Sequence, residues 1–400
     1  MPTEDEMTLD ERRKYLKRMK PRYQGANRVE QSHLLTEMQQ VTGMHRKSLL
    51  RLLHASSLER KPRTIQREPS YGFAVEQVIL KVWESLDYVC AERLTPSLLC
   101  LARHLAGFQV LRLTPDIEAQ LATISRATVA RLLQKHRSRK GRLPHKGPER
   151  ANHVTKDVPM GRIAWDTQEA GHFEVDLVHH AGASTTGEYL HTLHLIDVAT
   201  GWSERVAVLG RGQRAMQQGF GQVLDRLPFP VVELHPDNGT EFFNDHLVRF
   251  WKEKVTGVSL SRSRPYQKND NRMVEQKNDS LVRQYLGYDR LETQEHLALV
   301  NALYERMWLS YNLFQPVLHL KEKQVQQHKV KRKWDTAQTP YERLKVTGIL
   351  SVEAQARLQD VYEQTNPLAL RQEIYDRLAV IWETRTPQQV PTSSPVLVET

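Results

Sequence analysis

Three short segments between residues 172 and 286 constrain the fold of this 400-residue chain most strongly, because each combines a secondary-structure signal with a carboxylate. Segments 172–178 and 231–239 are apolar-alternating runs, as in β-strands, and each carries an aspartate at or near its end. Segment 269–275 opens a predicted helix, since Asn and Asp favour a helix start and apolar residues then recur at helical spacing. We expect the three acidic residues to meet in space; they are Asp176, Asp237 and Glu275.

Further strands and helices around these segments complete an α/β pattern. The chain predicts three strands joined by short turns, as in an antiparallel meander, at 173–180, 189–197 and 202–209. Helices and short strands then alternate, with helices at 213–227, 245–254 and 271–286 and strands at 231–234 and 258–261. The order βββαβαβα resembles the ribonuclease H-like arrangement, an α/β core with one mixed five-stranded sheet flanked by helices.

A cluster of three carboxylates on such a sheet suits divalent metal ions. Moving a phosphodiester bond requires stabilisation of charge on the attacking and leaving oxygens, which two ions about 3.5–4 Å apart provide. Mg²⁺ prefers hard oxygen ligands and keeps several waters, so a few carboxylates suffice. We therefore expect two Mg²⁺ ions, replaceable by Mn²⁺, and the catalytic residues of a polynucleotidyl transferase at Asp176, Asp237 and Glu275.

The N-terminal third predicts an all-α domain at 1–58 with a helix-turn-helix pattern. A basic helix at 11–19 ends at Pro21, and a break at 41–43 separates a helix from a second one rich in Arg and Lys. The residues expected to face DNA are Arg46, Lys47 and Arg51. A small helical bundle with solvated charges explains this pattern equally well.

A second helical domain is predicted at 72–136, with helices at 73–86, 95–105, 115–122 and 124–133. Its last helix repeats the pattern of a Ser cap, an apolar face and a polar face with Arg126 and Arg131. The linker that follows, 137–160, is too basic and too rich in Gly and Pro to bury a core. It is a phosphate-tracking arm or a solubilising tether, and its candidate DNA contacts are Arg139, Lys140 and Arg142.

Several phrases of the sequence resemble those of integrase-type insertion-sequence transposases, which belong to the retroviral integrase superfamily. They are Asp176–His180, Gly187–Leu193, Ala199–Trp202, Ser263–Tyr266 and Val274–Asn278, together with a glutamate 275 − 237 = 38 positions after Asp237. The resemblance covers about 160–345. It implies a DDE triad that carries the metal ions, strand cleavage and transfer at transposon ends, and a homo-oligomer, at least a dimer, that bridges two ends of double-stranded DNA and its target.

Basic and aromatic residues around the third segment suit phosphate contact and base stacking. These are Arg264, Tyr266, Lys268 and Lys277. Four other carboxylates compete for a place at the site. Asp197 is better explained as a cap of the 199–201 turn, Asp270 as a helix cap and Asp279 as a solvated acid, whereas Glu174 shares a strand face with Asp176.

Bulk properties limit the remaining possibilities. A net charge of +10 favours a polyanionic partner. Because two cysteines are too few for the zinc module of retroviral integrases, we predict no structural zinc. No membrane span or signal peptide is recognised, which favours a bacterial cytoplasmic, nucleoid-associated location. The catalytic core is assigned to 161–315, a basic and mainly helical C-terminal region to 316–384, and a disordered tail to 385–400.

Two alternatives to a DNA transposase remain. One is a DNA-binding regulator that uses only its helix-turn-helix domains, and the other is a metal-dependent nuclease without strand transfer, whose fold and metal site would look the same.

Overall fold

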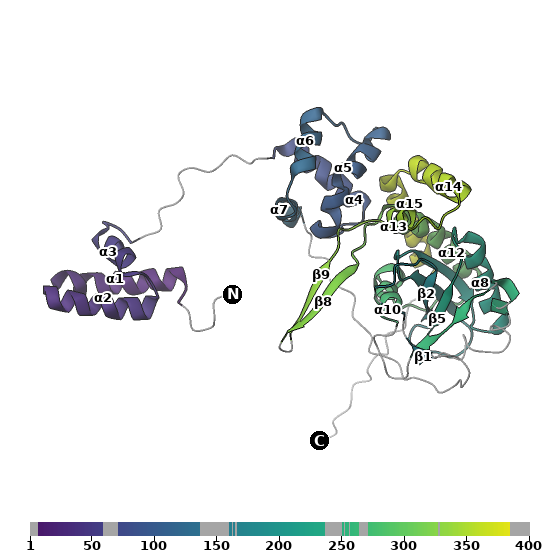
Figure 1. Ribbon diagram of the computed structural model, residues 1–400, viewed down its shortest axis with the longest axis horizontal. Coiled ribbons are helices and arrows are strands. Elements are labelled where there is room, and N and C mark those ends of the chain that lie inside the picture. The colour runs from purple at the N-terminus through teal and green to yellow at the C-terminus, as the bar shows by residue number, and fades with distance from the viewer. Residues whose placement is uncertain are drawn as a thin grey trace, which may run out of the picture. The chain divides into compact units, whose positions relative to one another are not determined.

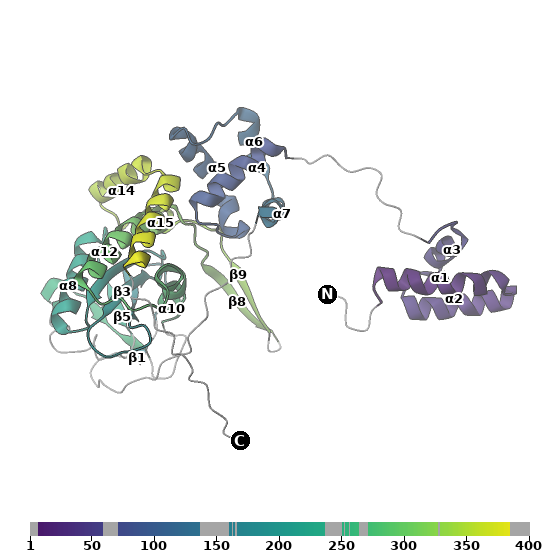
Figure 2. The ribbon, with the colours of Figure 1, turned by 180° about the vertical axis from the view of Figure 1, so that it is seen from behind.

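The computed structural model describes residues 7–58, 71–136, 160–161, 163–164, 166–236, 250–251, 253–255, 257–263, 271–326 and 329–384. The chain divides into two units, Met1–Ser70 and Tyr71–Thr400 (Figures 1 and 2). No helix in the described part of the chain has both the length and the apolar character needed to cross a membrane.

The first unit contains three helices, α1 Leu9–Gly25, α2 Arg28–Thr42 and α3 Arg46–His54. Helix α2 ends at Gly43, which adopts the left-handed conformation with φ of 65° that favours glycine. The core of this unit is a cluster of apolar side chains from all three helices, including Leu16, Met38 and Leu49. Helices α2 and α3 are separated at residues 43–45, close to the break predicted at 41–43, and a DNA-binding role for them stays a prediction.

Helix α1 differs from the prediction because it continues through Pro21 to Gly25. Leu16, Met19 and Tyr23 lie on one buried stripe that crosses the proline. A proline inside a helix removes one backbone hydrogen bond and crowds the preceding turn. Burial of Tyr23 beyond Pro21 offsets that cost, so tertiary packing overrides the local signal.

The second unit is built on a mixed five-stranded sheet with the order β4-β3-β2-β5-β6. β3 runs antiparallel to both of its neighbours, whereas β5 is parallel to β2 and β6 is parallel to β5. The predicted sheet is therefore confirmed, with the strands β2 His172–His179, β3 Leu190–Asp197, β4 Ser203–Leu209, β5 Glu233–Pro236 and β6 Ser259–Leu260. A separate short parallel pair joins β1 Met160–Gly161 to β7 Arg262–Ser263.

Helices cover both faces of this sheet. Helix α8, Gln213–Arg226, approaches closely through Gly219, where an added Cβ would lie 2.8 Å from Val208 on β4. Helices α10 Arg272–Asn278 and α12 Gln294–Leu309 pack on the opposite face, where Tyr304 bonds to Thr192 on β3. The sheet is thus buried on both sides, as in an α/β core.

Two of these helices continue into wider π-helical turns. Helix α10 passes into a π turn, Asp279–Arg283, and then into the short α11, Gln284–Leu286, while α12 ends in a π turn, Ser310–Phe314. Such π turns are rare and occur frequently at functional sites. Of the helix predicted at 245–254, residues 250–251 and 253–254 are described and are helical.

The second helical domain consists of α4 Phe73–Ser85, α5 Ala91–Gly107, α6 Pro115–Thr123 and α7 Arg126–His136. Three C-terminal helices, α13 Pro340–Thr347, α14 Val352–Gln364 and α15 Pro367–Glu383, complete the unit, and α15 packs against α4 and α12. Asp87 links these parts because it accepts hydrogen bonds from Tyr285, Arg371 and Tyr375.

The basic stretch between α12 and α13 forms an antiparallel hairpin of β8 Leu320–Gln326 and β9 Lys329–Trp334. The prediction of a mainly helical C-terminal region missed this element. The sequence of this hairpin has no apolar stripe of the kind that a packed helix needs. Hydrogen bonds between the two strands satisfy its backbone N–H and C=O groups instead.

Candidate active site

Asp176 lies near the middle of β2, the central strand, and is partly exposed between buried neighbours. Its Oδ1 accepts a hydrogen bond from the backbone N of Leu177 at 2.8 Å, and its Oδ2 accepts one from Nδ2 of Asn278 on α10 at 2.5 Å. The carboxylate is therefore held in one orientation by the helix that packs against its sheet face.

Asn278 in turn belongs to a buried polar chain. Its Oδ1 lies 2.6 Å from Nδ1 of His194, the residue opposite Asp176 on β3, and Nε2 of His194 lies 3.0 Å from Oγ of Ser203. Burial, together with the charge of Arg205, lowers the pKa of His194 to about 3, so the ring is neutral at physiological pH. A neutral ring that donates through Nδ1 fixes the Asn278 amide with its NH₂ toward Asp176.

Glu174 fastens the start of α10 to the same strand. Its buried carboxylate accepts hydrogen bonds from the backbone N of Val274, at 2.9 Å, and of Met273. These are donors of the first helical turn, and Asn271 at the N-cap position makes no side-chain cap. Burial raises the pKa of Glu174 to about 7 although both hydrogen bonds favour the charged form.

Glu275 is exposed on α10, one helical turn before Asn278. Residues three apart lie on one helix face, so Glu275 and Asn278 point the same way. The charge of Glu275 also acts on Glu174, whose pKa it raises. Glu275 thus lies on the helix that packs against the Asp176 strand, and a shared metal site of these two carboxylates stays a prediction.

Asp237, the third predicted carboxylate, lies outside the described residues. The last residue of β5 is Pro236, which pairs with Val175, the residue before Asp176. The described residues include no group of three or more His, Cys, Asp or Glu side chains that could hold a metal ion.

Asp197 has the predicted turn-capping role. Its Oδ2 accepts from the backbone N of Thr200 at 2.8 Å and from the Thr200 hydroxyl at 2.6 Å, while Oδ1 accepts from the backbone N of Gly171. These bonds fix the backbone geometry at the start of β2 and the end of β3.

Lys277 points away from the exposed face of α10. Its Nζ lies 4.8 Å from the ring centroid of Tyr311, and burial next to Arg93 and Arg205 lowers its pKa to about 7. A DNA contact by Lys277 stays a prediction. The other DNA-contact candidates of the core, Arg264, Tyr266 and Lys268, lie outside the described residues, as do Arg139, Lys140 and Arg142 of the linker.

In the helical domains, the predicted DNA contacts divide into exposed and paired side chains. Lys47 and Arg51 are exposed on α3, whereas Arg46 donates to Ser32 at 2.9 Å and to Thr36 on α2. Arg131 is exposed on α7, and Arg126 lies 3.7 Å from Glu92 in an exposed ion pair.

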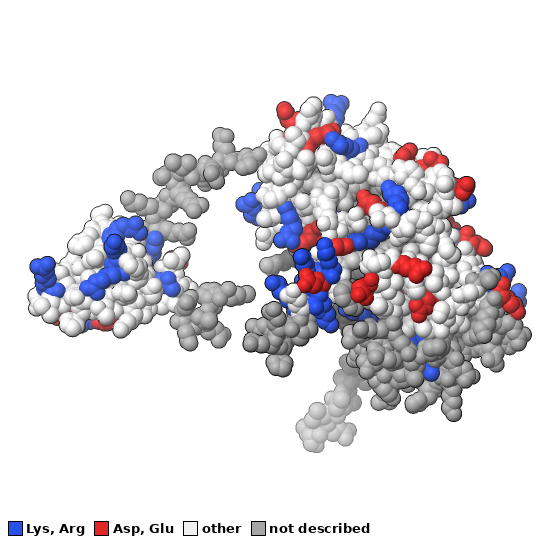
Figure 3. All heavy atoms as spheres, viewed as in Figure 1, with Lys and Arg blue, Asp and Glu red and all other residues white. Residues whose placement is uncertain are grey.

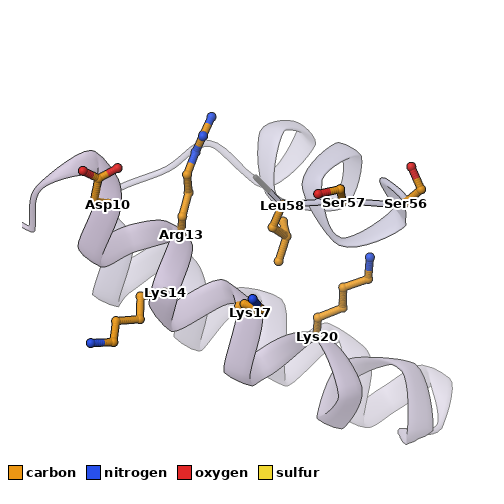
Figure 4. A pocket seen from close by; sticks show the side chains of 8 residues that line it. All are labelled: Asp10, Arg13, Lys14, Lys17, Lys20, Ser56, Ser57 and Leu58. Carbon is orange, nitrogen blue, oxygen red and sulfur yellow. The ribbon is translucent and has the colours of Figure 1, made fainter. Parts of the chain in front are cut away.

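The first unit also has a basic cavity of about 500 Å³ between α1 and the segment after α3 (Figure 4). Ser56, Ser57 and Leu58 line one side. The α1 side carries Asp10 and four cationic residues, Arg13, Lys14, Lys17 and Lys20. The face of this unit seen in Figure 3 has many Lys and Arg side chains and little acid.

Sequence reasoning missed the roles of Asn278 and Glu174. Their positions carried a usable signal: Asn278 is one helical turn after Glu275, and Glu174 lies two residues before Asp176 on the same strand face. What could not be read from the sequence is that the two residues fasten opposite ends of α10 to β2.

Comparisons with known proteins give three results. No protein-family model matches the chain. Among solved structures, the catalytic core domain of BIV integrase covers 45% of this chain and 97% of its own, at 19% sequence identity and a TM-score of 0.30. Uncharacterized protein y4rM of Sinorhizobium fredii is 36% identical over 305 residues, which cover 76% of this chain and 86% of that protein. The chain belongs to the same family as y4rM.

Proposed function

We propose that this protein is a DNA transposase of the DDE type, which cleaves DNA at the ends of a mobile element and joins those ends to target DNA. One observation supports the proposal: Asn278 and Glu174 hold α10, which carries Glu275, against β2, the central strand that carries Asp176.

Metal ions fit the donor chemistry of the site. The candidate ligands are carboxylates, whose oxygens are hard ligands that suit Mg²⁺ and Mn²⁺. Asp176, Asp237 and Glu275 would hold two such ions. Bound ions would supply Lewis-acid stabilisation of the charge on the attacking and leaving oxygens.

The residues of this chain have separate tasks in the proposed reaction. Asp176 presents a carboxylate from the sheet, in an orientation set by Asn278. Glu275 supplies a second carboxylate from α10, whose start Glu174 holds in place. Because Pro236 pairs with the residue before Asp176, the sequence position of Asp237 directly after it supports its assignment as the third carboxylate.

The helical domains would deliver the DNA. Exposed cations on α3 and α7, and the basic cavity along α1, are suited to phosphate contacts that hold the duplex without reading its sequence. A homo-oligomer of at least two copies would bring two ends together.

The test is an assay on labelled DNA that carries the element's own ends, in the presence of Mg²⁺, with wild type and Glu275→Gln compared. We expect joined products from the wild type and none from the variant, which retains its fold because residue 275 is exposed. Cleaved but unjoined products would identify a nuclease. DNA binding without products from either protein would identify a regulator, and both results would overturn the proposal.

A further inference from the structure

The β8–β9 hairpin stands on a fixed base. Val317 and Gln338 form an isolated antiparallel bridge, and His319 and Asp335 exchange hydrogen bonds of 2.8 and 3.0 Å. Arg343 on α13 contacts both sides of this base, since it donates to the carbonyl of Val317 at 3.0 Å and lies 2.7 Å from the Asp335 carboxylate. The direction in which the hairpin leaves the fold is therefore set by α13.

Beyond its base, the hairpin has little contact with the rest of the described chain. The two strands pair with each other, and neither packs extensively on another described element (Figures 1 and 2). The side chains of 321–324 and 331–334 are exposed. A two-stranded hairpin is only marginally stable alone in water, so one with these exposed side chains is suited to a partner.

The charges of the hairpin indicate the nature of that partner. Residues 320–334 contain six Lys or Arg and one acid, Glu322. Glu322 lies opposite Lys333, but Lys323 lies directly opposite Arg332, and like charges in this position destabilise a strand pair. Lys and Arg side chains gather over the hairpin in Figure 3. An anion between Lys323 and Arg332 would remove this repulsion.

We propose that the β8–β9 hairpin is an arm that binds the phosphate backbone of double-stranded DNA, with Lys323 and Arg332 on either side of a phosphate. A two-stranded β-ribbon fits the major groove of B-DNA, which is about 12 Å wide. Trp334, 49% exposed near the base, adds an aromatic surface beside these cations. The inference rests on the proposed function, since the arm would hold the DNA that the candidate active site processes.

The test measures binding of the full chain to a labelled mixed-sequence duplex in EDTA, where no metal-dependent chemistry occurs, over a range of salt concentrations. The decisive variant is Lys323→Glu. It places opposite charges at the cross-strand position, which favours the hairpin itself, so weaker binding cannot come from its unfolding. We expect affinity to fall about three- to tenfold near 0.1 M salt, and the slope against log salt to fall by about 1 for each phosphate that the variant no longer neutralises.

The matched control is Arg357→Glu, which makes the same change of charge at an exposed position on α14. We expect it to bind like the wild type. Unchanged binding by Lys323→Glu, or an equal loss in both variants, would overturn the proposal. So would a change in the sedimentation mass of Lys323→Glu without DNA together with unchanged DNA binding, since the hairpin would then be a contact between copies.

The same measurements separate failure of the arm from failure of the proposed function. Wild type that binds duplex through Lys323 but forms no cleaved or joined product with Mg²⁺ would retain the arm and reject the transposase. If wild type and Lys323→Glu bind and join DNA equally well, the transposase proposal is retained and the arm is rejected.

Discussion

The Asn278 side chain on α10 donates a hydrogen bond of 2.5 Å to the Asp176 carboxylate on β2. Because Asn278 also bonds to the buried, neutral His194, its amide cannot rotate without leaving a buried polar group unpaired. The orientation of Asp176 thus depends on a residue that has no acid–base chemistry of its own.

Replacing this amide should reduce strand transfer without affecting DNA binding. For Asn278→Ala we expect activity to fall by about 10- to 100-fold, the usual cost of removing a residue that orients a ligand carboxylate. Turnover and DNA affinity would be measured separately. Gln276→Ala, two residues away on the exposed face of α10, is the control and should retain activity. Equal activity of Asn278→Ala and wild type would contradict the positioning role.

Loss of the Glu174 carboxylate should destabilise α10. Glu174→Ala removes the acceptor for two backbone donors of its first turn, and we expect the free energy of unfolding to fall by about 1–2 kcal/mol, as for the removal of other helix caps. Glu174→Gln keeps an acceptor oxygen and should lose less. Urea unfolding measures both. The control is Glu275→Ala, at an exposed position on the same helix, which should leave stability unchanged while abolishing activity. If Glu174→Ala is as stable as the wild type, Glu174 does not cap α10.

The sequence predicted the sheet because apolar residues alternate along 172–178, although β2 and β3 are buried on both faces and β5 begins two residues later than the predicted strand 231–234. It also singled out Asp176 and Glu275 as candidates, since carboxylates next to apolar positions stand out, and their role stays a prediction. Tertiary contacts between distant residues left weaker signals. The extension of α1 past Pro21 depends on a core position for Tyr23, and the Asp176–Asn278 contact joins residues 102 apart.

The hairpin was missed for another reason. The side chains of 321–324 and 331–334 are exposed, and the sequence of this stretch has neither the helical nor the strand period of apolar residues. A basic connector explained its composition as well. Its cross-strand pairing and its base, where Arg343 contacts Val317 and Asp335, distinguish it from a loop, and both depend on contacts that the sequence does not show.

Acid should destabilise the second unit. Burial lowers the ring pKa of His191 and His194 to about 3 and of His319 to about 4, and that of His180 well below its ordinary value. Below pH 6.5 the unfolded chain therefore binds protons that the folded chain does not, so stability falls as pH falls from about 6.5 toward 3, by at most about 1.4 kcal/mol per pH unit for each histidine.

Glu174 opposes this trend, since its pKa is raised to about 7 and its protonation favours the folded chain as pH falls from about 7 to 4.5. Burial also raises the pKa of Asp197, so two carboxyl groups oppose four histidines and the net effect is a loss of stability. Urea unfolding at about pH 7.5 and about pH 5.5 measures it. His191→Phe keeps the stacking on Tyr189 and should make the pH dependence less steep; greater stability of the wild type at the lower pH would refute the prediction.

Asp237→Asn should abolish cleavage and leave DNA binding intact or improved. The substitution removes one negative charge but keeps the size of the side chain, so repulsion of the DNA backbone decreases while a proposed metal ligand is removed. Cleavage and affinity would be measured on the same labelled ends. The matched control is Asp225→Asn, on α8, which should behave as wild type. Full cleavage by Asp237→Asn would remove this residue from the triad.

Arg131→Ala should weaken binding to the element's ends without changing the chemistry. Arg131 is exposed on α7, and its only described hydrogen bond is to the Thr128 hydroxyl of the same helix, so no fold contact depends on it. We expect a loss of about 1–3 kcal/mol if it reads a base and a smaller, sequence-independent loss with a lower salt slope if it contacts a phosphate. Competition between end sequence and mixed sequence distinguishes the two. Arg103→Ala, which removes a cation paired with Glu118 on α6 of the same domain, is the control and should bind normally. If Arg131→Ala binds both duplexes as wild type does, α7 is not a DNA-contacting helix and end recognition must be assigned to the first unit.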